Sequence, residues 1–174
     1  MDPRPVGLLV AAGRCPGGSA RAHAITAVTV SEPTAAVVRR VLRAPPEVVY
    51  DEWLDPEALS EWMCPRPARA TSIELDGRPG GRFRIDIAEL GQRFSVEGTY
   101  LRLERPRRLE FTWTCSTWSA SVESRVTVTL DDHGSNETLM TIRHEQLPDD
   151  LLDQHREGWE RIAEQLEAQL IVPR

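Results

Sequence analysis

The sequence predicts an α+β domain in which a curved antiparallel sheet packs against a long C-terminal helix. Three observations predict this class. A strand-like segment is followed by two short helical segments, a run of further segments alternates apolar and polar residues, and the chain closes on an amphipathic stretch with helical spacing. The 174 residues are enough for one domain with a substantial core.

The predicted domain covers residues 34–174 and follows a loose extension, residues 1–33, that is rich in Gly, Ala and Pro and lacks periodicity. The β-branched stretch 34–43 predicts the first strand. A short helix is expected over 45–54, with two prolines near its first turn. A second is expected over 55–63, where Asp55 caps the helix and Pro56 takes its first position.

About six strands are expected next, so that the sheet has about six to seven in all. They are predicted over 70–76, 82–87, 93–100, 107–115, 124–130 and 138–144. In each of them apolar residues alternate with polar ones, which predicts one buried and one exposed face. Asp86 and Glu97 take polar positions in this alternation and should therefore face outward.

The closing helix is expected over 149–170, with Asp149 or Asp150 as its cap. Its predicted buried face carries His155, Trp159, Ile162 and Leu166 at helical spacing. Gly158 borders this face and costs its helix about 1 kcal/mol relative to alanine. Either the sheet approaches closely at Gly158, or space is left there for a ligand.

The stretch "ELDGRPGGRFRIDI", residues 74–87, raises the alternative of a phosphate-binding loop. Such a loop opens a helix whose N-terminus holds the anion, whereas a period-two strand follows these glycines. Residues 78–81, "RPGG", instead suit a type II turn with Pro in second and Gly in third position. The stretch is therefore interpreted as a hairpin.

Composition excludes several other classes. The formal net charge is −6, which argues against nucleic-acid binding. The absence of lysine excludes Schiff-base chemistry and an ordinary P-loop. Three widely spaced cysteines predict neither a disulfide framework nor a zinc site, and favour a reducing, cytoplasmic setting. No apolar run approaches the length of a membrane span, and the short run at 6–13 is a weak signal for export.

Four motifs carry a family resemblance: "DPEALSEWM", "RPGGRFRI", "GTYLRLERPRRLEFTW" and "HREGWERIAEQL". In their order and spacing they resemble homologues of the activator of the ninety-kilodalton heat-shock protein ATPase, a branch of the START-like (SRPBCC) superfamily of bacterial and other proteins. The resemblance implies the helix-grip fold, with an apolar cavity between sheet and long helix. The sequence departs from the family at Trp62-Met63-Cys64-Pro65, which borders the pocket mouth in related folds. Ligand preference therefore does not transfer.

The residues expected to line such a cavity are those that alternation and helical spacing place inside. They are Trp62, Phe83, Ile85, Phe94, Val96, Phe111, Trp113, Met140, His144, His155, Gly158 and Trp159. His144 and His155 could approach the same space, either as polar anchors or acid–base groups, or as structural residues bonded to the backbone. No catalytic set, metal site or cofactor is predicted, because Ser121 and Ser124 lack a nucleophile motif and no third metal ligand is at hand.

The leading hypothesis is non-catalytic binding of an apolar or aromatic small molecule. An enzyme of cyclase or hydrolase type in the same cavity is the second, and a module that stimulates a chaperone ATPase is the third. The assembly state is open, with a homodimer among the alternatives.

Overall fold

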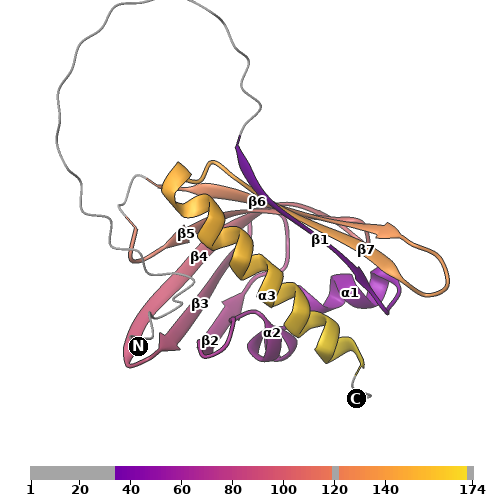
Figure 1. The fold of residues 1–174 in the computed structure, drawn as a ribbon, viewed down its shortest axis with the longest axis horizontal. Helices are drawn as coiled ribbons and strands as arrows, with labels where there is room; N and C mark the ends of the chain where they lie inside the picture. Colours follow the sequence, from indigo (N-terminus) through magenta and orange to yellow (C-terminus); the bar gives the residue numbers. More distant parts are fainter. Residues whose placement is uncertain (1–33, 119–121, 172–174) are drawn as a thin grey trace, which may run out of the picture.

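The computed structural model describes residues 34–118 and 122–171 and shows a helix-grip fold (Figure 1). The strands are β1 (Ala35–Leu42), β2 (Arg69–Leu75), β3 (Arg82–Glu89), β4 (Gln92–Glu104), β5 (Arg108–Cys115), β6 (Ser124–Asp132) and β7 (Thr138–Glu145). They form one seven-stranded antiparallel sheet in the order β1-β7-β6-β5-β4-β3-β2. The predicted fold class is confirmed. The predicted extension, residues 1–33, lies outside the described residues.

The helices α1 (Pro46–Glu52) and α2 (Pro56–Trp62) follow β1 as predicted. Each begins at a proline, whose missing N–H would have no partner in a first turn. The Asp55 side chain accepts hydrogen bonds from the backbone N–H groups of Glu57 (2.9 Å) and Ala58 (3.4 Å), so its predicted capping role is confirmed. The α2 helix packs on β2 and α3.

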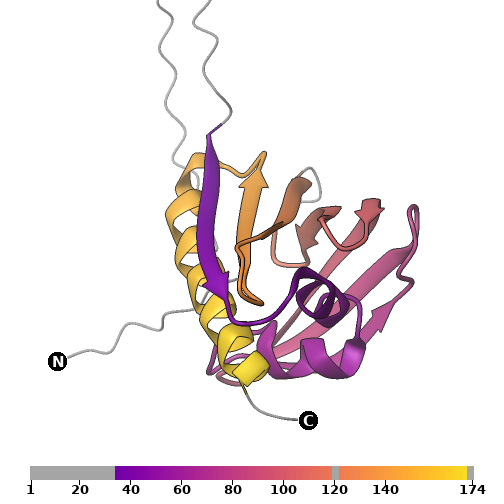
Figure 2. The same ribbon diagram turned by 90° about the vertical axis from the view of Figure 1, so that its right-hand side faces the viewer.

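The long helix α3 (Leu152–Ile171) follows a single 3₁₀ turn, η1 (Asp149–Leu151). The prediction that Asp149 or Asp150 caps the helix is wrong. Both lie inside the 3₁₀ turn, whose N-cap is Pro148 and whose start has no side-chain cap hydrogen bond. Their carboxylates still sit at the positive end of the helix dipole. Figure 2 shows the sheet curving around α3, which lies beside β1.

The sheet register places the predicted apolar residues on one face. Phe83 pairs with Gly98, Ile85 with Val96, and Ile87 with Phe94 across β3 and β4. The same face continues through β5, β6 and β7 and is buried throughout. The α3 residues that cover it are the predicted ones, namely His155, Trp159, Ile162 and Leu166.

The hairpin interpretation of residues 78–81 is confirmed. The Gly81 N–H donates to the Arg78 carbonyl at 2.8 Å, and Gly80 has a φ of +80°. The Gly80 N–H also donates to the Tyr100 carbonyl at 2.7 Å, which fastens the turn to β4.

A glycine in β4 lets an aromatic ring pack closely against the strand. A Cβ atom at Gly98 would lie 1.9 Å from the Thr112 carbonyl oxygen and 2.5 Å from the Phe83 ring. The missing side chain therefore allows Phe83 to reach the middle of the inner face, where the cavities described below lie.

The segment after α2 is fastened to α3 by one side chain. The Gln165 amide nitrogen donates to the carbonyls of Trp62 (2.9 Å) and Cys64 (2.8 Å), and its oxygen accepts from the Arg66 N–H (3.1 Å). Three hydrogen bonds thus set the position of Met63, which lies between the two carbonyls in sequence. None of the described helices is long and apolar enough to cross a bilayer.

Candidate functional site

Two small apolar cavities lie between the sheet and the helices. The first, called here the short-helix cavity, lies between the two short helices and strands β2–β5 and has a volume of about 20 Å³. It is lined by Trp53, Leu59, Met63, Ile73, Leu75, Phe83, Ile85, Tyr100, Leu109, Phe111 and Trp113. Apart from the Tyr100 hydroxyl and two indole nitrogens, these side chains are hydrocarbon or thioether.

The second, called here the α3 cavity, also has a volume of about 20 Å³ and lies under the long helix. It is lined by Met63, Pro65, Ile85, Ile87, Trp113, His155, Trp159 and Ile162. Met63, Ile85 and Trp113 line both cavities. The two spaces therefore adjoin, with these three side chains between them.

Each cavity is large enough for about one water molecule and far below the several hundred cubic ångströms of a typical ligand pocket. A ligand larger than water needs a side chain to move. Met63 is the best suited of the three shared residues, because its unbranched thioether chain changes rotamer easily. Ile85 is β-branched and held within β3, and Trp113 is held within β5.

Aromatic rings form a continuous layer around the cavities. Phe83 meets Phe111 edge to face, with centroids 5.5 Å apart, and Trp113 lies 5.3 Å from Trp159. Pairs of rings at such distances contribute stability in addition to the stability that comes from burying their apolar area. The layer is therefore both the core of the domain and the wall of the cavities.

His144 is a structural residue with every polar atom paired. Trp159 Nε1 donates to His144 Nδ1 at 3.0 Å, and His144 Nε2 lies 2.7 Å from Ser124 Oγ. An indole N–H can only donate, so Nδ1 is the unprotonated nitrogen and Nε2 carries the hydrogen. Nε2 then donates to Ser124 Oγ, and Ser124 donates to the Trp113 carbonyl at 2.8 Å. The pKa of His144 lies well below its usual value, mainly because of burial and also because His155 is near, so the ring is neutral.

The Ser124–His144 pair resembles a nucleophile and its base in distance only. A base must present a bare Nε2 to the hydroxyl, whereas here Trp159 holds the hydrogen on Nε2. Ser124 and His144 are also essentially without solvent exposure and do not line either cavity. The geometry therefore argues against a serine hydrolase at this pair.

His155 is the opposite tautomer of His144 and has one ring nitrogen without a partner among the described residues. Its Nδ1 lies 3.0 Å from the Leu151 carbonyl, which can only accept, so Nδ1 carries the hydrogen. Nε2 is buried and has no hydrogen-bond partner among the described residues. Burial lowers the pKa of His155, which the Leu151 hydrogen bond partly opposes, and the ring is neutral at pH 7.

Three indole nitrogens, like His155 Nε2, are buried without a hydrogen-bond partner among the described residues. Trp53 Nε1, Trp62 Nε1 and Trp113 Nε1 are buried donors without a partner in the described part of the chain. A buried polar group left unpaired costs about 1–3 kcal/mol. Trp53 and Trp113 line the short-helix cavity, and Trp113 also lines the α3 cavity.

The cavities contain half of the residues predicted to bind a ligand. Phe83, Ile85, Phe111, Trp113, His155 and Trp159 line one cavity or both. Trp62, Phe94, Val96, Met140, His144 and Gly158 are buried in the surrounding core and line neither. Contact of these six with a ligand stays a prediction from the sequence.

Sequence reasoning missed most of the short-helix cavity. Trp53, Leu59, Met63, Ile73, Leu75, Tyr100 and Leu109 line it without having been predicted to bind a ligand. The available signal was the pair of short amphipathic helices, whose apolar residues had to pack on some part of the sheet. The α3 cavity adds Pro65, Ile87 and Ile162.

Cys64 follows Met63 but is no candidate nucleophile. Burial, together with the nearby Glu89 carboxylate, raises the pKa of the Cys64 thiol to about 12. The thiol is therefore protonated at neutral pH, and a protonated thiol is a poor nucleophile and metal ligand. The described residues also contain no cluster of three or more His, Cys, Asp or Glu side chains suited to a metal ion.

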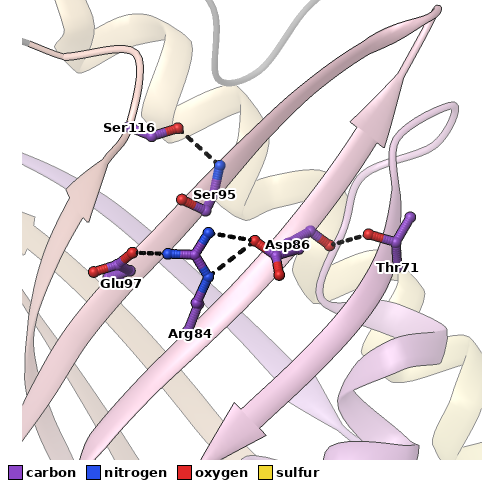
Figure 3. Close-up of polar contacts among 6 residues, drawn as sticks. All are labelled: Thr71, Arg84, Asp86, Ser95, Glu97 and Ser116. Atoms are coloured by element: carbon purple, nitrogen blue, oxygen red, sulfur yellow. Dashed lines mark hydrogen bonds and ion pairs between the residues drawn. The ribbon is translucent and has the colours of Figure 1, made fainter.

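The outer face of β3 and β4 carries a polar network that is separate from the cavities (Figure 3). Arg84 forms ion pairs with Asp86 (2.7 Å) and with Glu97, and Thr71 donates to the Asp86 carbonyl (3.2 Å). The outward orientation predicted for Asp86 and Glu97 is confirmed. A shallow groove of about 370 Å³ lies beside the network and includes Arg93 and Ser116. Because its charges pair with one another, the network stabilises the sheet surface modestly.

Comparison with protein families gives one match that covers most of the chain. The sequence model described as "Activator of Hsp90 ATPase homolog 1-like protein" matches residues 43–170. Among curated proteins, an uncharacterised protein of Schizosaccharomyces pombe is 29% identical over 133 residues, which is 76% of this chain and 34% of that protein. The chain therefore spans about a third of the length of that relative.

Solved structures share the fold over nearly their whole length. A Chromobacterium violaceum protein is 30% identical with a TM-score of 0.73, and the match covers 80% of this chain and 98% of that one. A Nitrosomonas europaea protein has a TM-score of 0.68 at 24% identity, over 78% and 93% of the two chains. A Plasmodium falciparum protein described as an HSP90 activator has a TM-score of 0.65 at 21% identity, over 80% and 97%. The last two likenesses show the fold alone.

Proposed function

Because the chain belongs to the family of Activator of Hsp90 ATPase homolog 1-like proteins, whose fold it shares with solved structures, we propose that it binds an apolar small molecule between sheet and helices without transforming it. The observation that carries this proposal is the pair of adjoining apolar cavities that share Met63, Ile85 and Trp113. A shift of Met63 would merge them into one space lined by aromatic rings.

Binding without chemistry fits the side chains that line the cavities. They include one titratable imidazole, His155, and one phenol, Tyr100, whose pKa burial raises far above neutrality. His144 Nε2 donates its hydrogen to Ser124 Oγ, so His144 cannot act as a base toward this hydroxyl. No described residue of the cavity walls is an activated nucleophile, so an enzymatic role of cyclase or hydrolase type has less support.

The test is a titration with naphthalene, a flat apolar probe, followed by isothermal calorimetry and thermal shift. Ile73→Phe places extra carbon in the short-helix cavity from a partly exposed position of β2, so it should weaken binding several-fold and leave the domain folded. Leu103→Phe is the matched control, because Leu103 is also partly buried against the core but lines neither cavity. Saturable binding that Ile73→Phe weakens and Leu103→Phe does not is the expected result. Equal affinities in all three proteins would place the site elsewhere.

Stimulation of a chaperone ATPase is the second candidate. The description of the family and the Plasmodium falciparum neighbour, which is described as an HSP90 activator, favour it. It predicts that the pure protein accelerates ATP hydrolysis by a ninety-kilodalton heat-shock protein and that Ile73→Phe leaves this effect unchanged. Saturable naphthalene binding without any acceleration would leave ligand binding as the better-supported function.

A further inference from the structure

Two residues that line the α3 cavity each carry one buried polar atom without a hydrogen-bond partner among the described residues. His155 Nε2 is a bare lone pair, because Nδ1 holds the ring hydrogen for the Leu151 carbonyl. Trp113 Nε1 is an N–H group with no partner among the described residues. Both side chains are about 96% buried and line this cavity. Each unpaired atom destabilises the ligand-free protein, because a buried polar group without a hydrogen bond is costly. A ligand that forms the missing hydrogen bond would therefore bind more tightly.

A hydroxyl group is the simplest polar group that satisfies both atoms. Its hydrogen can be donated to His155 Nε2, and its oxygen can accept from Trp113 Nε1. A ketone or an ether accepts only and would leave His155 unpaired, whereas a hydrocarbon would leave both unpaired. A carboxylate would bring a charge into a space with no cation among its lining residues, at a large desolvation cost.

The side chains that line the two cavities give the orientation. Both cavities have room for about one water molecule, but His155 lines only the α3 cavity, whereas the short-helix cavity is surrounded by the rings of Trp53, Phe83, Tyr100 and Phe111. A flat hydrocarbon ring fits among such rings by edge and face contacts. Met63 lies between the two spaces and would move aside where the ring meets its hydroxyl.

We infer that the ligand is a neutral hydroxylated aromatic compound whose hydroxyl group is held between His155 and Trp113 and whose ring lies in the short-helix cavity. This inference rests on the proposed function and adds the polar group that the site recognises. A phenol titrates near pH 10, so such a ligand is neutral and able to donate at physiological pH.

The experiment compares naphthol, methoxynaphthalene and naphthalene by calorimetry against the 174-residue chain. Two unpaired buried atoms become paired only with naphthol, so naphthol should bind about tenfold or more tightly than either of the others. His155→Phe keeps a ring and removes the acceptor, so it should abolish the preference for naphthol over naphthalene, measured as the ratio of the two affinities in the same variant. His133→Phe makes the same change at an exposed histidine between β6 and β7 and should keep the wild-type preference.

The outcomes separate the inference from the proposed function. Equal binding of the three probes by the wild type would overturn the inference and leave the apolar site standing. A naphthol preference that persists in His155→Phe would also overturn it. No saturable binding of any probe would overturn both. If His155→Phe does not fold, as judged by circular dichroism, Trp113→Phe replaces it, and an undiminished preference in that variant counts against the inference.

Discussion

The hydrogen bond from Trp159 to His144 links two buried groups that have no other partner within residues 34–118 and 122–171, and this predicts a strong energetic coupling. Trp159→Phe removes the donor and leaves His144 Nδ1 unpaired at a site with no solvent exposure. His144→Leu removes the acceptor and leaves Trp159 Nε1 unpaired, while Ser124 keeps its bond to the Trp113 carbonyl. The double variant contains neither unpaired group.

The magnitude follows from these pairings. Each single variant includes about 1–3 kcal/mol for the unpaired buried group, in addition to the loss of packing. Since the double variant lacks both penalties, it should be less destabilised than the sum of the single variants by at least about 2 kcal/mol, which is twice the lower limit for one unpaired group. Urea denaturation of the four proteins, followed by circular dichroism at pH 7.5, gives the coupling free energy.

Trp113 provides the control for this cycle. Its ring lies 6.1 Å from the His144 ring in an edge contact, but no hydrogen bond joins the two side chains. The pair of changes Trp113→Phe and His144→Leu should therefore couple more weakly than the Trp159–His144 pair, because a ring contact but no direct hydrogen bond joins the two side chains. Coupling as weak for Trp159 as for Trp113 would refute the assigned tautomer of His144 and, with it, the argument against a Ser124–His144 nucleophile.

Three further outcomes are expected. The pKa values of His144 and His155 are lowered in the folded state, so below about pH 6.5 the unfolded chain binds more protons than the folded one. The free energy of unfolding should therefore decrease as the pH is lowered through this range, by up to about 1.4 kcal/mol per pH unit for each histidine. Urea titrations at several pH values measure this, and a flat profile between pH 7 and 5 would contradict it. Gly80→Val should destabilise by about 1–3 kcal/mol because φ is +80°, whereas Arg78→Ala, which removes only an exposed ion pair, should cost less than about 1 kcal/mol. Thermal melts that show equal losses would count against the turn assignment. Met63→Ala should merge the two cavities, lower stability by about 2–5 kcal/mol and tighten naphthalene binding in calorimetry. Unchanged affinity would mean that Met63 does not obstruct the ligand.

The fold was predictable because period and spacing fix which side chains face inward. Phe83, Ile85 and Ile87 alternate with charged residues, and this alternation leaves one register that buries the apolar set. The start of α3 was predicted less well, because an acidic pair before a helix is compatible with a cap or with a first turn. Asp149 and Asp150 form a 3₁₀ turn instead.

The site was predictable only in part, because cavities arise where packing is incomplete and the sequence does not record gaps. Ile73 and Leu75 come from β2, an edge strand with mostly exposed neighbours, so nothing in its pattern marks them as ligand contacts. Met63 owes its position to the hydrogen bonds of Gln165, a residue about a hundred positions away. Contacts of this kind appear only in three dimensions.

The two histidines show how the same residue type acquires different roles. Their rings are 5.1 Å apart, and sequence reasoning gives both the same candidate functions. His144 lies on strand β7, and its two ring nitrogens are paired by side chains of other elements, Trp159 of α3 and Ser124 of β6. His155 lies on a helix, where the carbonyl four residues earlier takes Nδ1 and turns Nε2 away from the backbone. The His144 ring therefore has both nitrogens paired, whereas the His155 ring, which lines a cavity, keeps an unpaired lone pair. If the protein recognises a polar group on its ligand, His155 rather than His144 is the residue that does so.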